Sequence, residues 1–408
     1  MIIIIVWEQR KLKSISTRIL RKNKDLQSDR PLTISAQDGL VDQTDYFNKQ
    51  IASKQLTKYF LLTRGDFAYN KSYSVDFPYG AIKRLNRYKN GVLSTLYLVF
   101  KPLDSVNSDF LEHYYDTSKW YSEIYRNAAE GARNHGLLNI SAEDFFNTTL
   151  IIPVKVKEQN KIANLLNIIN KLLSLQQRKL DLLKQLKKGL LQKMFADKDT
   201  KQPVLRFDGF SGDWEQQKFL KTIDSIIDYR GRTPKKLGLT WSNSGYLALS
   251  ALNVKNGWIN KSSADSHFGD QKLYDTWMKK TPLHKGQVVF TTEAPMGNVA
   301  QIPDKNKYIL SQRTIAFVTK EILTDDFLAY FLATSKVQMR LNSLSTGGTA
   351  KGVSQKSLNY LHIIYPKLNE QYKISRLLKN VNNSISLQQS KTDKLTQLKK
   401  FLLQQMFI

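Results

Sequence analysis

Side chains that can bond phosphate groups or base edges gather in or beside a few polar loops of this chain. Glycine lets backbone amides approach a phosphate closely, and Arg, Lys, Asn, Ser and Thr can donate to phosphate oxygens or base edges. Any one such loop is more often an ordinary solvated turn, and only the recurrence of these loops in one chain favours contact with nucleic acid. The residues that we predict to contact nucleic acid are Asn70, Lys71, Ser72, Lys83, Arg84, Arg230, Arg232, Thr233, Thr292, Arg313, Gly348, Thr349 and Lys351.

The charge of the chain points in the same direction. Its 62 Lys and Arg residues outnumber its 35 Asp and Glu residues, which leaves a formal net charge of +27. Such an excess indicates a polyanionic partner, and no run of basic residues is long enough to form a disordered tail. We therefore expect double-stranded DNA as the partner; a ribosome-like or membrane-adjacent protein with a basic surface is the open alternative.

The sequence lacks the common catalytic motifs. The sequence has no phosphate-binding loop, no GxGxxG after a strand, no HExxH, no GxSxG and no Asn-Pro-Pro-aromatic motif. The absence of cysteine excludes thiolate metal sites and disulfides, and the five histidines are scattered. We expect no catalytic residue, no metal site and no cofactor in this chain. The apolar start MIIIIV is too short to span a membrane, so we expect a cytoplasmic protein.

An internal repeat organises the chain. Residues 158–195 recur without a gap as residues 370–407, with well over half of the positions identical, and the WEQ at Trp7 returns at Trp214. Each half therefore reads as a globular region followed by one long helix. We predict an α+β fold with a pseudo-twofold repeat, in which two mixed α/β domains at 1–155 and 201–366 alternate with helical regions at 156–200 and 367–408.

Within each repeated segment, a seam of residues at alternating steps of four and three is mostly apolar, which is typical of a coiled coil. We expect the two helices to pair antiparallel, with Gln176 and Gln388 facing each other, because parallel pairing would require a long return through the second globular region. The alternative is that each helix packs only on its own globular region. The predicted helix–helix interface consists of Leu166, Ile169, Leu173, Gln176, Leu180, Leu183, Leu378, Val381, Ile385, Gln388 and Leu395.

Further apolar positions lie outside this seam. Leu165, Ile168, Leu172 and Leu182 would form a second face of the first helix, which predicts contact with a partner protein.

Several strings in this order closely resemble the specificity subunit of type I restriction-modification systems. They are WEQRKL from Trp7, GDFAYNKS from Gly65, YGAIKRL from Tyr79, FTTEAPMGNVA from Phe290 and EQNKIANLL from Glu158, and the resemblance covers nearly the whole chain. It implies that each globular region is a target recognition domain reading one half of a split DNA site. The paired helices would space the domains and bind methyltransferase subunits. Because the globular regions differ in sequence, we expect the site to be asymmetric.

The resemblance also implies the partners. They are double-stranded DNA, two copies of the methyltransferase subunit, and a restriction and translocase subunit, with S-adenosylmethionine, ATP and Mg in those partner subunits. Two other functions stay open at this point: an enzyme that acts on DNA alone, and a basic coiled-coil adaptor outside restriction-modification that binds RNA or an acidic protein. One departure is that the second WEQ follows Pro203–Phe207, whereas the first follows MIIIIV, so we expect altered contacts between the first segment and the last helix.

Overall fold

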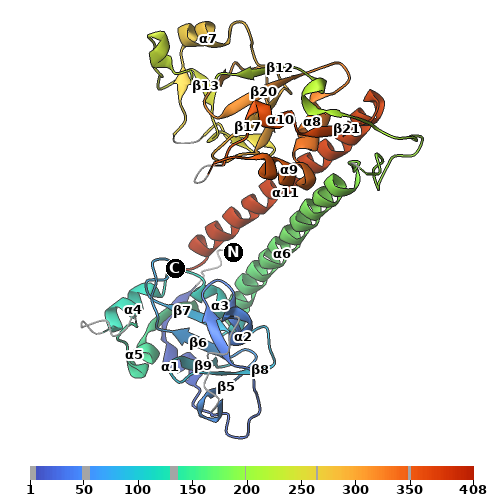
Figure 1. The fold of residues 1–408 in the computed structure, drawn as a ribbon. Helices are drawn as coiled ribbons and strands as arrows, with labels where there is room; N and C mark the ends of the chain where they lie inside the picture. The colour runs from blue at the N-terminus through green and yellow to red at the C-terminus, as the bar shows by residue number, and fades with distance from the viewer. Residues whose placement is uncertain (1–5, 48–55, 129–136, 198, 263–264, 348–350) are drawn as a thin grey trace, which may run out of the picture. The chain divides into compact units, whose positions relative to one another are not determined.

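The computed structural model describes residues 6–47, 56–128, 137–197, 199–262, 265–347 and 351–408. The chain divides into two compact units, unit 1 with Met1–Gln177 and Ser390–Ile408 and unit 2 with Arg178–Gln389. Each unit mixes short strands and helices and contains part of both long helices (Figure 1). The predicted fold class, two mixed α/β regions with two long helices, is confirmed.

The central sheet has the same topology in both units. In each unit the sheet has four antiparallel strands. When the strands are numbered by their order in the sequence, they lie side by side in the order 1-4-2-3. The largely buried strands are rich in Val, Ile, Phe and other residues that favour extended backbone. The order is β2 (Ser16–Arg18), β9 (Leu98–Pro102), β6 (Phe67–Asn70), β7 (Ala81–Arg84) in unit 1, and β12 (Ile223–Asp228), β20 (Thr314–Thr319), β17 (Val288–Thr291), β18 (Val299–Gln301) in unit 2.

Other elements recur around this sheet. In each unit the first strand pairs with the strand that leads directly into the long helix. Along the sequence, three short helices lie between the last strand of the central sheet and that strand. The recurring elements are β1 (Trp7–Lys11), α1 (Leu12–Ile15), α3 (Ser108–Tyr115), α4 (Tyr121–Asn127), α5 (Ala142–Asn147) and β10 (Thr149–Pro153), matched by β11 (Glu215–Lys218), η3 (Phe219–Thr222), α8 (Asp325–Leu332), α9 (Ser335–Leu344), α10 (Gln355–Leu358) and β21 (His362–Tyr365).

The segments inserted between the sheet strands differ between the units. Among the described residues, unit 1 carries two two-stranded pairs, whereas unit 2 carries a three-stranded sheet and a two-stranded pair, and short helices accompany them in both units. These elements are β3 (Leu32–Ser35), β4 (Gly39–Asp42), α2 (Gln43–Phe47), η1 (Leu56–Lys58), β5 (Phe60–Thr63) and β8 (Asn90–Leu93) in unit 1, and η4 (Pro234–Leu237), β13 (Tyr246–Leu249), β14 (Val254–Lys255), β15 (Trp258–Ile259), β16 (Phe268–Gly269), α7 (Gln271–Met278) and β19 (Ile309–Leu310) in unit 2.

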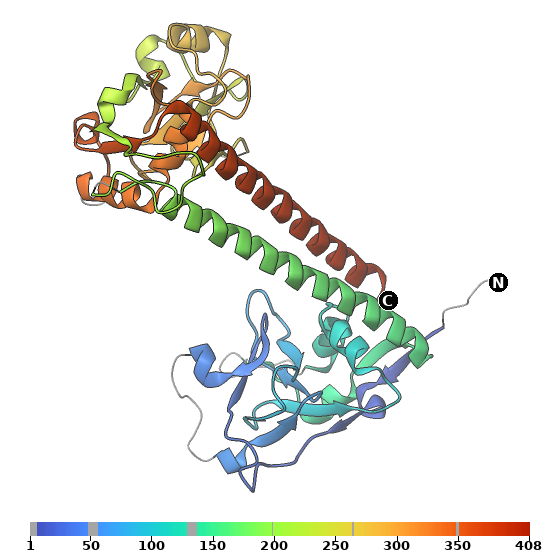
Figure 2. The same cartoon turned by 90° about the vertical axis from the view of Figure 1, so that its right-hand side faces the viewer.

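The two long helices are α6 (Val156–Lys193) and α11 (Leu368–Gln405), each 38 residues and unbroken (Figure 2). At about 1.5 Å per residue, each is about 57 Å long. Each position of the predicted apolar seam is buried or half-buried in both helices, while the residues on the other faces are mostly exposed.

A repeated glutamine fixes the start of each long helix to its unit. Gln159 Nε2 donates to the carbonyl of Pro153 (2.9 Å), and its Oε1 accepts from the amide of Asn107 (2.7 Å), the residue that caps α3. Gln371 makes the same two bonds, with the carbonyl of Pro366 and the amide of Thr324 (2.8 and 2.9 Å). Since both glutamines are buried, these bonds satisfy backbone groups that water does not reach.

Each core also takes in the end of the long helix that starts in the other unit. Phe407, past the end of α11, is 1% exposed in the core of unit 1, and its ring lies 5.2 Å from that of Phe110. Phe195, past the end of α6, lies 5.1 Å from Phe327 in the core of unit 2. In each unit the start of one long helix therefore packs in the same core as the end of the other. The two helices thus run antiparallel. The alternative, that each helix packs only on its own globular region, is wrong.

Removing one helix-end side chain tests this arrangement. Phe407→Ala should lower the free energy of unfolding of unit 1 by about 3–5 kcal/mol, because it leaves a cavity between Phe110 and Tyr114. Phe401→Ala is the matched control, because Phe401 lies near the end of α11, six residues before Phe407, and is 56% exposed. Chemical denaturation, with hydrogen exchange to report on unit 1, measures both changes. Equal destabilisation by the two variants would contradict the packing described.

Candidate nucleic-acid interface

Several predicted DNA-contacting residues of unit 2 meet at one end of its central sheet. The pairing of Asp228 with Ile315 and of Thr291 with Thr314 places the ends of β12 and β17 beside the start of β20. Arg230 follows β12, Thr292 follows β17 directly, and Arg313 directly precedes β20. The sheet thus brings together three loops that are far apart in the sequence.

Carboxylates orient two of these arginines. Asp228 Oδ1 and Oδ2 each accept from Arg230 Nε at 2.9 Å, and Asp228 also accepts from Gln355 Nε2 at 2.8 Å. Burial favours the neutral acid, but the bonds from Arg230 and Gln355 outweigh it and hold the pKa of Asp228 below its ordinary value. Arg313 Nε lies 3.6 Å from Glu293 Oε1, and its side chain is 52% exposed. Because a guanidinium has five donors, both arginines keep donors for a ligand.

Arg232 is held by aromatic rings instead. Its guanidinium lies 4.7 Å from the ring centroid of Tyr229 and 5.8 Å from that of Trp277. Such a position is favourable for a cation. Arg232 is half-buried, and no carboxylate of the described residues forms an ion pair with it. The neighbouring Thr233 stands at the N-cap position of η4, and its side chain makes no capping bond.

A loop before α10 covers this end of the sheet. The amide of Val353 donates to the carbonyl of Thr292 (2.9 Å), and Gly352 pairs with Glu293 as an isolated bridge. Thr292 itself is 1% exposed, and its hydroxyl has no hydrogen-bond partner among the described residues. Lys351 is exposed in the same loop. The predicted Gly348 and Thr349 lie outside the described residues.

Unit 1 repeats this arrangement with different side chains. The amide of Leu138 donates to the carbonyl of Lys71 (3.0 Å), and Ser72 pairs with Leu137 as an isolated bridge. Lys71 therefore occupies the place that Thr292 takes in unit 2. Asn70 Oδ1 accepts from the amide of Ser72 (3.0 Å), which holds the turn that follows β6. Both units present polar residues at the same end of the same sheet.

Lys83 and Arg84 lie elsewhere. The register of β6 and β7 pairs Asn70 with Ala81 but Phe67 with Arg84, so Arg84 is at the opposite end of the sheet from Asn70. Lys83 Nζ lies 2.9 Å from Asp116 Oδ1. The structure therefore does not bring these two residues together with the rest of the predicted set.

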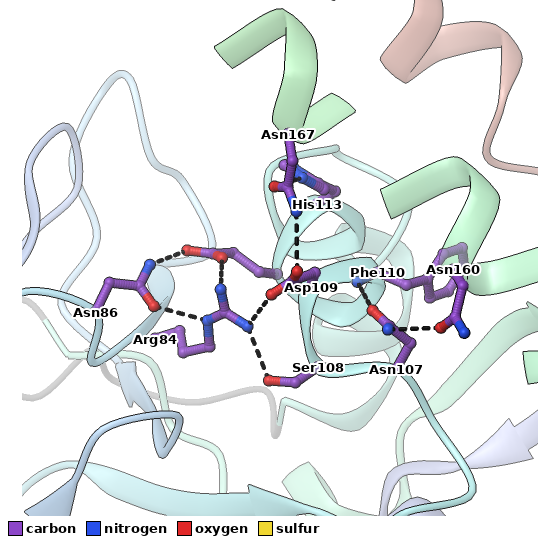
Figure 3. A network of polar contacts seen from close by, with 10 residues as sticks. Arg84, Asn86, Asn107, Ser108, Asp109, Phe110, His113, Asn160 and Asn167 are labelled. Carbon is purple, nitrogen blue, oxygen red and sulfur yellow. Dashed lines mark hydrogen bonds and ion pairs between the residues drawn. The ribbon is translucent and has the colours of Figure 1, made fainter. Parts of the chain in front are cut away.

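Arg84 belongs to a polar network inside unit 1 (Figure 3). Its guanidinium pairs with Asp109 (2.6 Å) and Glu112 (2.5 Å) of α3, and its side chain is only 14% exposed. Asp109 also accepts from Asn167 of α6 (2.9 Å). Arg84 thus ties β7 to α3 and, through Asp109, to the long helix. In unit 2 the equivalent residue of β18, Gln301, donates to Asp326 of α8 (2.8 Å).

The sequence interpretation missed the residues that position the arginines. Asp228, Glu293 and Gln355 hold Arg230 and Arg313, and Tyr229 and Trp277 hold Arg232. Asp228 and Tyr229 immediately precede Arg230, so a local signal existed for them. Gln355 and Trp277 are distant in sequence, and only the folded sheet brings them near.

Neither membrane spans nor metal sites are visible in the described part of the chain. None of its helices combines the length and apolar character needed to cross a membrane. It also contains no group of three or more His, Asp or Glu side chains placed to hold a metal ion.

Replacing Arg84 separates its structural role from DNA contact. Arg84→Met should lower the free energy of unfolding by about 1–3 kcal/mol, because two carboxylates are deprived of their ionic hydrogen bonds. The exposed Arg87→Met is the matched control and should change little. Thermal and chemical denaturation measure both. Equal, negligible effects would show that the network does not stabilise unit 1.

The same substitution should alter the pH dependence. Burial raises the pKa of Asp109, but the hydrogen bonds and charge of Arg84 outweigh it, so the pKa lies below its ordinary value of 3.8. A lowered carboxyl pKa stabilises the folded state above about pH 4, and that stabilisation is lost as the pH falls through the folded-state pKa. Stability below pH 4 should therefore fall less steeply in Arg84→Met than in the unaltered protein.

The chain is similar in sequence to known DNA specificity proteins. Residues 213–397 match the family model of the type I restriction modification DNA specificity domain. The type I restriction enzyme MjaVIII specificity subunit of Methanocaldococcus jannaschii is 22% identical over 328 residues, covering 76% of this chain and 72% of that protein. The putative MjaX specificity subunit of the same organism is 23% identical over 257 residues, covering 60% of this chain and 55% of that protein.

Solved structures share the fold. The S subunit of a type I restriction-modification system from M. genitalium has a TM-score of 0.59 at 13% identity, covering 100% of this chain and 97% of that one. A chain from a study of complex assembly and conformational transition of the type I R-M system has a TM-score of 0.54 at 16% identity, covering 98% and 96%. The chain is therefore similar, over residues 213–397, to the type I restriction modification DNA specificity domain, and it shares its fold with the S subunits of type I restriction-modification systems.

Proposed function

We propose that each unit reads one half of a split, asymmetric DNA site and that the long helices space the two readers and bind methyltransferase subunits. One observation carries the proposal: both units have the same sheet, and the same end of that sheet is lined by polar loops whose residues differ. Lys71 and Thr292 occupy equivalent places there. A common scaffold with unlike contact residues is suited to reading two different sequences.

The interface of unit 2 has the chemistry for both kinds of DNA contact. Arg313 and Lys351 are exposed cations that can neutralise phosphates. Arg230 is fixed by a carboxylate and Arg232 by aromatic rings, so each guanidinium is oriented before DNA arrives. Bidentate donation from an oriented arginine to guanine is the commonest specific contact in the major groove.

The surface of α6 supports a protein partner. Leu165, Ile168, Leu172 and Leu175 are each 40% or more exposed and recur at helical spacing on a face away from the buried seam. Exposed apolar side chains gathered in this way mark protein contact sites. The corresponding positions of α11 hold Leu377, Asn380, Ser384 and Leu387. The two methyltransferase copies would therefore meet unequal surfaces.

The remaining partners follow from this assignment. The methyltransferase subunits would supply S-adenosylmethionine, and a restriction and translocase subunit would use ATP and Mg, so this chain would catalyse no reaction. It would act in the cytoplasm, where it meets DNA. The family match disfavours a basic adaptor outside restriction-modification.

Substitution of the oriented arginines tests half-site reading. Arg230→Ala with Arg313→Ala should weaken or relax recognition of one half-site and leave the other half unchanged, with a cost of about 1–3 kcal/mol for each arginine that reads a base. Lys221→Ala is the control, because Lys221 is exposed at the opposite end of β12. Mapping of methylated adenines by the reconstituted methyltransferase gives both half-sites. Equal weakening at both, or an equal effect of Lys221→Ala, would contradict the assignment.

The helix surface is tested by giving α6 the residues of α11. Ile168→Asn with Leu172→Ser should weaken binding of one methyltransferase copy about tenfold or more, which corresponds to about 1.4 kcal/mol. Asn164→Ser, a neighbouring exposed change, is the control. Native mass spectrometry across a dilution series measures the number of bound copies. Retention of two copies with unchanged affinity would place the methyltransferase on another surface.

A further inference from the structure

A basic pocket in unit 2 is lined by both long helices and by the end of the central sheet at which β17 begins. Its volume is about 800 Å³, which is within the range of pockets that hold small ligands. Asp326 is the one carboxylate among the described residues of its lining. The cations in the lining are five lysines and no arginine, namely Lys184, Lys187, Lys261, Lys285 and Lys379.

Four of these five lysines have no acidic partner. Lys261 Nζ lies 2.5 Å from Asp304 Oδ2, which balances its charge. The other four form no ion pair or hydrogen bond with any group in the described part of the chain. Asp326 accepts a hydrogen bond from Gln301 (2.8 Å). Like charges that share one hollow repel one another, so a bound anion would be stabilised there.

Lys187 is the half-buried member of this set, whereas the other lysines are exposed. Burial lowers the pKa of its ammonium group, because desolvation disfavours the charged form. A negative ligand beside it would favour the charged form again. A second hollow of about 250 Å³ also has Lys187 in its lining, so this lysine stands where the two hollows meet.

The equivalent place in unit 1 contains acidic residues. Lys399 corresponds to Lys187 in the internal repeat, and it lines a pocket of about 440 Å³ together with Glu112 and Asp116. These two carboxylates pair with the cations of β7, at 2.5 and 2.9 Å. Positive and negative groups therefore balance each other in the pocket of unit 1.

Unit 2 lacks those two carboxylates. The repeat matches α3 with α8, and the positions of Glu112 and Asp116 are occupied by Ala329 and Ala333. Both alanines line the smaller hollow beside Lys187. Unit 2 has thus kept the lysine of the long helix without the acidic residues that accompany its counterpart in unit 1. The difference leaves an open cationic site in one unit only.

An exposed aromatic ring belongs to the same lining. Trp258 of β15 is 55% exposed. The turn before it is fixed to β18, because the amide of Gly257 donates to the carbonyl of Val299 (2.7 Å) and Asn256 Oδ1 accepts from the amide of Val299 (3.4 Å). An indole face held in this way is suited to stack on a nucleobase.

We propose that this pocket binds a free nucleoside polyphosphate, with its phosphates on Lys184, Lys187 and Lys379 and its base on Trp258. Lysine binds phosphate as a point charge, and linked phosphates match several lysines in one hollow. An acidic peptide carries its carboxylates on separate side chains, which suits the planar fork of arginine better. The proposal does not depend on half-site reading, because Thr292 and Arg313 lie at the opposite end of the sheet.

Isothermal titration calorimetry of the full-length protein tests the site, with ATP and inorganic tripolyphosphate as probes and no divalent cation. We expect saturable binding of ATP. Lys184→Gln with Lys379→Gln should weaken binding of both probes about tenfold or more. Lys188→Gln with Lys221→Gln is the matched control, because both lysines are exposed and lie outside the lining. It removes the same charge and should leave the affinity unchanged.

Two further comparisons identify the ligand. Trp258→Ala should weaken binding of ATP but not of tripolyphosphate, which has no base. Duplex DNA shares the phosphate chemistry, so ATP is also titrated into protein saturated with duplex, and unchanged ATP affinity is expected. Loss of ATP binding in that titration would assign the lysines to the DNA backbone and overturn the proposal.

Three other results would also overturn it. They are absence of saturable ATP binding, an equal loss of affinity in the control pair, and binding of a polyglutamate peptide as tight as that of tripolyphosphate. Thermal unfolding of each variant confirms that weaker binding does not come from unfolding. The two lysines chosen for substitution are exposed, so the folded state should be retained.

Discussion

The completion of each core by the end of the opposite long helix is the constraint on which the rest of the structure depends. Phe407 meets Phe110 in unit 1, and Phe195 meets Phe327 in unit 2. Trp7 and Trp214 flank these pairs at 6.1 and 6.0 Å from the same phenylalanines. Because each helix is anchored at both ends, its length cannot change without removing a large side chain from a core. This requirement accounts for the equal length of the two helices, 38 residues each.

Polar contacts play different roles at the two ends of the central sheet. At one end, Arg84 or Gln301 holds the helix that follows the sheet, and Gln159 or Gln371 fixes the long helix to that helix's cap. These groups are buried or partly buried and satisfy one another, so a substitution there destabilises the unit. Among the described residues, the other end carries no comparable clamp between helices. Its loops can therefore vary in sequence, which is what readers of different half-sites require.

The features that could be predicted from the sequence are those that depend on its internal repeat and on its apolar periodicity. Both long helices follow from a seam that recurs over 38 residues, and the mixed domains follow from short apolar runs between polar loops. Sequence reasoning misplaced Arg84 because a basic residue in a strand has the same sequence signature whether it faces solvent or a carboxylate on a neighbouring helix. It did not foresee the crossing of helix ends into opposite cores, because the contact of Phe407 with Phe110 depends on the return of the chain and not on a local pattern. The aromatic support of Arg232 by Trp277 was hidden for the same reason.

The most direct test of the account is a map of adenine methylation produced by this chain together with its cognate methyltransferase subunit and S-adenosylmethionine. The account predicts a single motif of two different specific halves separated by a spacer of fixed length, methylated only when both proteins are present. A contiguous motif, a symmetric one, or methylation by the methyltransferase subunit without this chain would contradict the claim that two unlike units on paired helices specify the site.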